Sequence, residues 1–326
     1  MSASAAITAP CKINLHLKIG GRRSDGYHDL LSVFAGLDFG DTLWFDEGER
    51  GDSSCHIEMI GGNPSMAADL PLERNIIVRA AALFRECTGY DRALRVRLEK
   101  RIPLGGGLGG GSSDAASTLM ALDALAGTAL SRERLTAMAE ILGSDVPFFL
   151  CGGMALVTGR GEGIRPLPMP KMPIWVVLVN PGFASGTAEA FALLDAARGQ
   201  ALPSALPGGR GAVLPEAGSF YEATGELSGE ALAAALGDHP ASWPYGNDFL
   251  PVFLADRERG DVYEDMLTGL NSLGADFSGL SGAGATCFGV FSRQGAAEAA
   301  VRVLKKRWNF VCLTFFLARS ATSVLQ

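Results

Sequence analysis

The chain has 326 residues, of which 48% are hydrophobic and 19% are charged, and its formal net charge is −7. This length and composition allow compact cores in two domains, while the acidic balance argues against nucleic acids and anionic membranes as partners, since both select a basic surface. The apolar runs are far shorter than the roughly 20 residues of a membrane span, and residues 1–10 lack the pattern of an export signal. We therefore expect a cytoplasmic, globular protein.

The first half of the chain mixes strand and helix patterns. Apolar and polar residues alternate over 11–19 and end at a glycine pair, which predicts a half-buried strand. A polar turn follows, and then further elements in this order: a strand over 30–45, a helix over 73–87, a strand over 95–100, a glycine-rich loop with a helix, and a helix over 131–142 that Ser131 opens and Gly143 ends.

A second unit begins where prolines precede a buried strand within residues 169–182. Residues 199–246 are rich in Gly, Pro and Ala, which predicts that most of this range is a surface excursion with one helical piece. A helix, a strand-loop-strand segment, another helix and a last strand follow, which favours a sheet with helices on one face. We place the domains at 1–168 and 169–326.

The most informative segment is the sequence PLGGGLGGGSS at residues 103–113, where six of the seven residues from Gly105 to Gly111 are glycine. Glycines allow backbone N–H groups to converge on an anion, and the amphipathic helix pattern that follows offers its free N-terminal N–H groups. We expect the loop to bind a nucleotide polyphosphate through Pro103, Leu104, Gly105, Gly106, Gly107, Leu108, Gly109, Gly110, Gly111, Ser112 and Ser113.

Other glycine motifs fit the flanking residues less well. A Walker A loop requires a lysine after its last glycine, but Ser112 follows Gly111. A dinucleotide fold requires a strand that enters the first glycine directly and an acidic residue at the end of a second strand, whereas Pro103 interrupts the entry and Asp123 lies in the helical pattern. The protein-kinase motifs are absent. A flexible linker stays the alternative, although strand and helix patterns adjoin the loop.

Four motifs occur in order: PCKINLHLKIGGRRSDGYHDL, the glycine loop with SSDAA, LGSDVPFF, and LSGAGATCFGVF. Together they resemble the GHMP small-molecule kinase superfamily over roughly residues 9–318 apart from the excursion. The resemblance implies an α+β fold of two domains, the first like ribosomal protein S5 domain 2 and the second ferredoxin-like, with the active site in the cleft between them. It also implies ATP and Mg²⁺ as cofactors.

The resemblance assigns catalysis to Asp145 and Lys12. Asp145 would accept the proton of the acceptor hydroxyl during phosphoryl transfer, and Lys12 would orient it. The residues alone favour a different interpretation, in which Asp145 is a helix N-cap or turn residue and Lys12 is a strand-edge lysine. No metal ligand can be assigned, although Ser113 at the helix start is a candidate.

The D-G-Y-H sequence is similar to members of the superfamily that phosphorylate the 2-hydroxyl of a cytidine-diphosphate-linked methylerythritol. This implies a small-molecule substrate held by Asn14, Tyr27 and His28, with the Tyr ring stacking on cytosine and the His bonding to its polar edge. Phe191 falls where the family supplies a second aromatic across from the first, and Thr187, also expected to hold the substrate, lies one helical turn earlier. A plain surface turn at Tyr27 and a core position for Phe191 stay open as alternatives.

The last motif implies a loop that closes over the phosphates, with Ser281, Gly282 and Gly284. The family more often has serine where Ala283 stands, which puts only a side-chain hydroxyl in doubt. Three other functions remain: a GHMP kinase for homoserine, mevalonate or a sugar; a silent nucleotide-binding regulator of the same fold; and a glycine-loop dehydrogenase.

Overall fold

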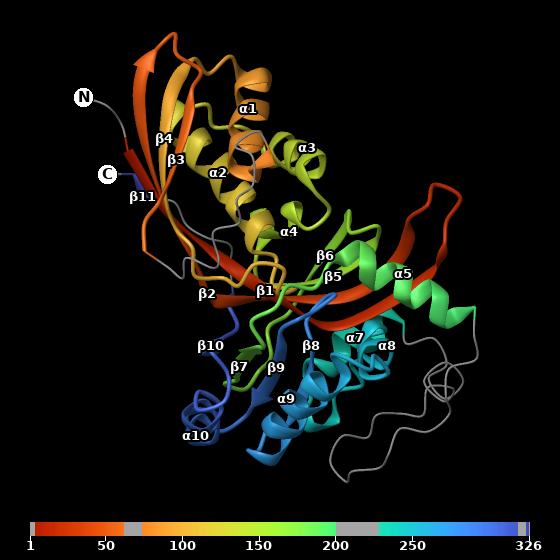
Figure 1. Ribbon diagram of the computed structural model, residues 1–326. Coiled ribbons are helices and arrows are strands. Elements are labelled where there is room, and N and C mark those ends of the chain that lie inside the picture. Colours follow the sequence, from red (N-terminus) through yellow and green to blue (C-terminus); the bar gives the residue numbers. More distant parts are fainter. Residues whose placement is uncertain (1–3, 62–73, 200–227, 319–323, 326) are drawn as a thin grey trace.

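Two β-sheets organise the chain (Figure 1). The computed structural model describes residues 4–61, 74–199, 228–318 and 324–325. In Figure 1 the two long strands β1 and β2 cross the molecule, with helices α1 to α4 above them and the second sheet with helices α8 to α10 below.

The first sheet has seven strands in the described residues. Its main path runs β11-β1-β2-β4-β3, and β5 pairs with β2 and β6. Proline lacks the N–H that a ladder needs, and Pro10 lies where the register of β1 shifts. The strands are β1 (Ser4–Arg22), β2 (His28–Arg50), β3 (Cys55–Met59), β4 (Arg92–Glu99), β5 (Met154–Gly159), β6 (Gly163–Leu167) and β11 (Val324–Leu325).

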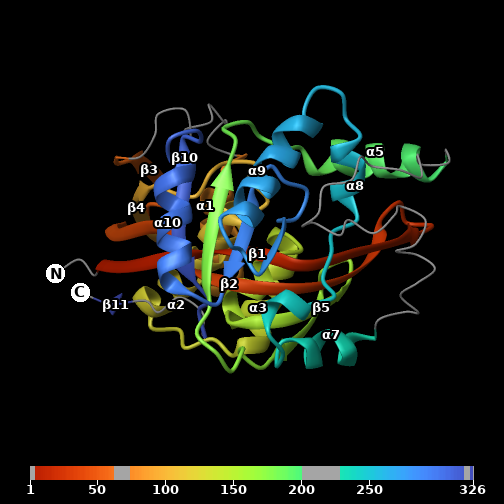
Figure 2. The same cartoon turned by 90° about the horizontal axis from the view of Figure 1, so that it is seen from below.

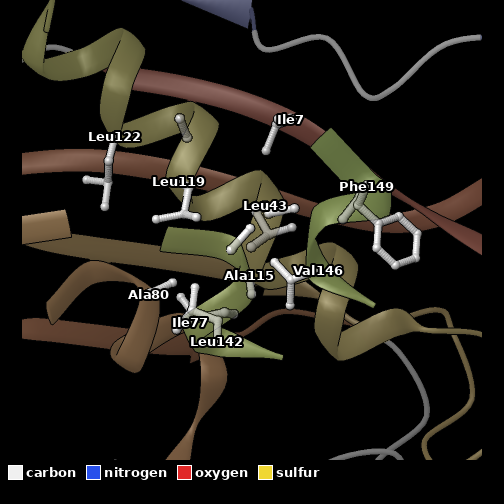
Figure 3. Packing of buried hydrophobic residues seen from close by; sticks show 14 of the residues in the cluster. Ile7, Leu43, Ile77, Ala80, Ala115, Leu119, Leu122, Leu142, Val146 and Phe149 are labelled. Carbon is white, nitrogen blue, oxygen red and sulfur yellow. The ribbon is translucent and has the colours of Figure 1, made fainter. Parts of the chain in front are cut away.

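Four helices cover one face of this sheet: α1 (Ile76–Thr88), α2 (Gly110–Ala126), α3 (Arg132–Leu142) and α4 (Val146–Cys151). The sequence predicted an amphipathic helix after the glycine loop, with Ala116, Leu119, Leu122 and Ala126 on its apolar stripe. In the structure α2 is instead buried on nearly all sides, because β1 and the other three helices surround it, and Ala126 is only half-buried. Figure 3 shows Leu119 and Leu122 of α2 among side chains of these neighbours.

The second sheet has the strand order β10-β7-β9-β8, with every neighbouring pair antiparallel. In chain order, helical segments connect β7 to β8 and β9 to β10. This connectivity and strand order are those of a ferredoxin-like fold, so the prediction is confirmed. Helices α9 and α10 pack on this sheet (Figure 2). The elements are β7 (Trp175–Asn180), α5 (Thr187–Arg198), α8 (Phe249–Leu254), α9 (Gly260–Ser272), β8 (Phe277–Leu280), β9 (Cys287–Phe291), α10 (Gln294–Leu304) and β10 (Phe310–Phe315).

The predicted excursion at 199–246 needs a correction where the structure describes it. Residues 200–227 lie outside the described residues, but 228–246 form α7 (Gly229–Ala235) and a 3₁₀ turn (Pro240–Ser242) that pack into a core. Trp243 is buried and its ring lies 6.0 Å from that of Phe277. The Gly, Pro and Ala content of the segment concealed a few large apolar residues that anchor it.

One core cluster joins the two sheets. It contains Leu15 and Val33 of the first sheet together with Val176 and Phe288 of the second. Residue 168 falls between the last strand of one sheet and the first of the other, yet β11 returns to pair with β1. The division at 168 therefore stays a prediction about domains that share a core.

We predict that Trp243→Ala lowers the free energy of unfolding by about 3–5 kcal/mol, since a large buried side chain is replaced by a cavity. Ile141→Ala is the matched control because its side chain is exposed, and it should change stability by less than about 0.5 kcal/mol. Urea denaturation of the full chain measures both. Equal stability of the two variants would contradict the packing of residues 228–246 into a core and would support their prediction as a surface segment.

Candidate active site

The glycine loop lies between β4 and α2 and opens onto a cleft. Gly107 and Gly109 have φ values of +73° and +70°, in the left-handed region. A Cβ on Gly107 would collide with the carbonyl oxygen of Ser281, and one on Gly109 would lie 2.8 Å from the Phe149 ring. Gly109 caps α2 without a side chain, so the first N–H groups of this helix are free to bind an anion.

Loop residues next to the strands of the second sheet hold this glycine loop in place. The Ser281 hydroxyl donates a hydrogen bond to the Gly107 carbonyl oxygen at 2.8 Å, and the Thr286 N–H donates to that of Gly106 at 3.2 Å. The Ser185 N–H donates to the Gly105 carbonyl oxygen at 3.0 Å. The segment with Ser281, which the sequence predicted to close over the phosphates, thus lies directly against the glycine loop.

Lys12 and Asp145 meet across this cleft, with 3.4 Å between Nζ and Oδ2. The Lys12 ammonium also donates to Asn14 Oδ1 at 2.6 Å and lies 4.4 Å from the centre of the Phe34 ring. A carboxylate, an amide oxygen and an aromatic face therefore surround a side chain that is 4% exposed. Lys12 is not a strand-edge lysine but a buried cation with fixed partners.

Local sequence explains why the Asp145 carboxylate is available. Asp145 occupies the N-cap position of α4, yet its side chain makes no capping bond. The second helical residue is Pro147, which has no N–H to donate to a capping carboxylate. The carboxylate, 31% exposed, turns to Lys12 and the cleft instead.

Asn14 links three parts of the site. Besides accepting from Lys12, its side chain donates to the Ser32 hydroxyl at 3.0 Å, and its backbone N–H donates to the Ser281 hydroxyl at 3.3 Å. The register of β1 shifts between Asn14 and His16, as is common beside active sites. Asn14 lines the cleft, but the bonds seen here orient Lys12 and join β1 to the closing loop.

An aromatic cluster forms the other end of the cleft. The His28 and Phe191 rings stack with centroids 4.9 Å apart, and His28 Nε2 lies 2.9 Å from Asp195 Oδ1. Tyr27 is 59% exposed, and the Arg160 guanidinium lies 5.1 Å from its ring centre. Phe191 was expected opposite Tyr27; in the structure its ring contacts those of His28 and Phe249.

A single cleft of about 1570 Å³ contains these groups. Pockets for one small ligand measure roughly 300–1,000 Å³, so this cleft has room for two ligands side by side. Among the predicted site residues, Ser113 and Ser281 do not line it because both are fully buried. Those that line it are Lys12, Asn14, Tyr27, His28, the residues from Pro103 to Ser112, Asp145, Thr187, Phe191, Gly282 and Gly284.

The sequence reasoning missed Lys100, Arg160 and Asp195, which also line the cleft. Asp195 stands four residues after Phe191 on α5, and this spacing places the two on one helix face. That signal was readable from the sequence. Nothing local distinguishes Arg160 from other loop arginines.

Lys100 belongs to a buried ion cluster beneath the glycine loop. Its ammonium bonds to Asp114 Oδ2 at 2.7 Å and to Asp41. Burial acts against the Lys100 charge, but the two carboxylates outweigh it and raise the pKa of Lys100 above its ordinary value. Burial also raises the pKa of Asp114 to about 7, although Lys100 acts in the opposite direction.

Comparisons with known proteins decide the family. Residues 75–153 match the model of the GHMP kinases N terminal domain, and residues 223–309 match that of the GHMP kinases C terminal. A 4-diphosphocytidyl-2-C-methyl-D-erythritol kinase of Salinispora tropica is 39% identical over 91% of this chain and 86% of that relative. The chain belongs to the GHMP kinase family.

Solved structures agree with this assignment. A crystal structure of 4-(cytidine 5'-diphospho)-2C-methyl-D-erythritol kinase matches with a TM-score of 0.68 and 30% identity over 98% of each chain. A homoserine kinase from Cytophaga hutchinsonii has a TM-score of 0.67 over 98% of this chain and 97% of that one, but at 19% identity it shows the fold alone. The predicted GHMP architecture is confirmed. None of the helices in the described residues is long and apolar enough to span a bilayer.

We predict that Gly107→Ala weakens ATP binding by about ten-fold or more, because a Cβ at positive φ strains the loop and displaces the Ser281 carbonyl. Gly21→Ala is the control, since a Cβ there meets no atom within 4 Å. Calorimetric titration with a non-hydrolysable ATP analogue measures the affinity. If both variants bind as the unaltered chain does, the loop does not form the phosphate site.

A second prediction concerns pH. Because the native pKa of Asp114 lies near 7 and its ordinary value is 3.8, the folded chain retains a proton that the unfolded chain releases between these values. The contribution of Asp114 to stability therefore falls as pH rises from about 4 to about 7. Asp114→Asn removes this component, so unfolding measured across that range should show a smaller decline for the variant. Parallel pH profiles would contradict the buried-carboxyl assignment.

Proposed function

We propose that this chain transfers the γ-phosphoryl group of ATP to the 2-hydroxyl of 4-diphosphocytidyl-2-C-methyl-D-erythritol, a step of non-mevalonate isoprenoid synthesis. The observation that carries the proposal is the position of the Lys12–Asp145 pair, which lies in one cleft with the glycine loop and with the aromatic cluster of Tyr27, His28 and Phe191. ATP bound at the glycine loop and an acceptor whose nucleobase is bound at the aromatic cluster would meet at Asp145.

Asp145 acts as the general base of this reaction. Its carboxylate accepts the proton of the attacking hydroxyl, which needs removal as the bond to phosphorus forms. Lys12 holds that carboxylate in place and offers positive charge beside the developing alkoxide. Asn14 fixes the ammonium from the other side.

The glycine loop supplies the second part of the catalysis. Backbone N–H groups of the loop and of the first turn of α2 bind the phosphates, and the positive end of the helix stabilises their charge. Ser281 fixes the loop through its bond to Gly107. Positioning of this kind is the main catalytic contribution in phosphoryl transfer.

We propose Mg²⁺ as the second cofactor of this reaction. When bound with ATP it would neutralise charge on the transferring phosphates. Mg²⁺ takes one or two protein ligands and keeps several waters. The Ser113 hydroxyl is buried at the first turn of α2 and has no hydrogen-bond partner in the described residues. This oxygen has the chemistry of such a ligand, but Ser113 is fully buried and does not line the cleft, so its position in this structure does not fit a Mg²⁺ ligand.

The aromatic cluster carries substrate specificity. The exposed face of Tyr27 can stack on a pyrimidine, and His28, paired with Asp195, can bond to its edge. The relatives named above act on a cytidylylated compound by their names, which supports cytosine as the base. Homoserine and mevalonate carry no base, and for them this cluster would have no purpose.

We predict that Asp145→Asn lowers kcat by about 10²- to 10⁴-fold, the effect of removing a positioned general base. ATP affinity should stay unchanged because the glycine loop is intact. Asp261→Asn, at an exposed position of α9 outside the cleft, is the control. Near-normal turnover of Asp145→Asn would place the base elsewhere and would leave Asp145 as a turn residue.

The substrate assignment is tested by one coupled assay of ATP consumption. The full chain is incubated in parallel with 4-diphosphocytidyl-2-C-methyl-D-erythritol, homoserine and mevalonate. We expect turnover with the cytidylylated compound alone. Turnover with another acceptor would leave a GHMP kinase of different specificity, and no turnover with any would favour the nucleotide-binding regulator.

A further inference from the structure

Asp195 makes a contact that the phosphoryl-transfer chemistry does not require. It lies on α5, whereas His28 begins β2, and the two residues are 167 positions apart in sequence. His28 Nε2 lies 2.9 Å from Asp195 Oδ1, and the His28 side chain is 5% exposed. Phe191 of the same helix stacks on the imidazole at an interplanar angle of 15°.

These contacts determine which ring nitrogen of His28 carries a hydrogen. A carboxylate oxygen only accepts hydrogen bonds, so Nε2 must be the donor in this pair. In the neutral ring Nδ1 then has no hydrogen and can only accept. The ring lines the cleft with Nε2 turned to Asp195, and no partner of Nδ1 is seen among the described residues.

We propose that Asp195 is a positioning residue which fixes His28 as the Nε2–H tautomer, so that Nδ1 accepts a hydrogen bond from the exocyclic amino group of cytosine and rejects uracil. This inference rests on the proposed function and adds to it the origin of base selection. Position 4 of cytosine carries an amino donor, whereas position 4 of uracil carries an oxygen acceptor. An Nδ1 lone pair bonds to the first and is repelled by the second.

Stacking alone cannot make this distinction. Tyr27 and Phe191 offer flat faces that bind either pyrimidine, because every base has a π-face. Discrimination requires a polar group of defined donor or acceptor character, held in one orientation. Asp195 keeps the hydrogen of the His28 ring on Nε2, so Nδ1 is an acceptor, and Phe191 limits rotation of the ring by stacking on it.

The alternative is that the pair only joins α5 to the first sheet. In that case loss of Asp195 would affect stability and both pyrimidines equally. Two measurements distinguish the positioning role of Asp195 from a purely structural one. These are the tautomer of His28 and the ratio of kcat/KM values for two substrates that differ at position 4 of the base.

The test uses the full-length chain and the variants Asp195→Ala and Asp195→Asn. Nitrogen-15 NMR of the histidine rings at about pH 8, where an ordinary imidazole is neutral, reports the tautomer without any substrate. Steady-state kinetics with 4-diphosphocytidyl-2-C-methyl-D-erythritol and its uridine counterpart report base selection. Asp29→Ala is the matched control, because this neighbouring carboxylate is exposed and bonds to Arg23 instead.

We expect Nε2–H at His28 in the unaltered chain and a mixture of tautomers in Asp195→Ala. That variant should raise KM for the cytidine substrate by on the order of ten-fold with little change in kcat, and should lose a similar factor of preference over uridine. Asp195→Asn should restore most of the preference, because its amide oxygen also accepts from Nε2–H.

Three results would overturn the inference: an Nδ1–H or doubly protonated ring in the unaltered chain, an unchanged preference in Asp195→Ala, or an equal loss in Asp29→Ala. Failure of the proposed function looks different, because the unaltered chain would then not phosphorylate the cytidine substrate at all. The NMR measurement would still report on the His28–Asp195 pair in that case.

Discussion

A buried ammonium group must be neutralised by its neighbours, and Lys12 imposes this constraint at the centre of the molecule. Asp145, Asn14 and the Phe34 ring surround its charge. These partners come from α4, β1 and β2, so the requirement fixes three elements relative to one another. The same contacts leave a carboxylate facing the cleft, so the residue that neutralises Lys12 is also the general base that we propose.

The rest of the site depends on contacts between the two sheets. The glycine loop follows a strand of the first sheet, but its carbonyl groups accept from Ser185, Ser281 and Thr286 of the second unit. The aromatic cluster is divided likewise, with His28 on β2 and Phe191 on α5. Neither half of the chain contains a complete site, which explains why the two units share a core cluster.

Sequence patterns predicted the parts of this arrangement that are local. The glycine run and the buried strands follow from residues close together in the chain, whereas the family resemblance implied the ferredoxin-like order and pointed to Lys12 and Asp145. The Asp195–His28 pair and the burial of Trp243 were missed, since both depend on partners distant in sequence. The burial of α2 on nearly all sides was also missed, because the neighbours of this alanine-rich helix come from distant parts of the chain.

The central claim is that Asp145 lies between a phosphate donor and a cytidine-bearing acceptor in one cleft. A crystal structure of the full chain with a non-hydrolysable ATP analogue and 4-diphosphocytidyl-2-C-methyl-D-erythritol tests it most directly. The account predicts the γ-phosphate above the glycine loop, cytosine against Tyr27 and His28, and the 2-hydroxyl within about 2.6–3.2 Å of the Asp145 carboxylate. A 2-hydroxyl remote from Asp145, or cytosine bound at the glycine loop, would contradict it.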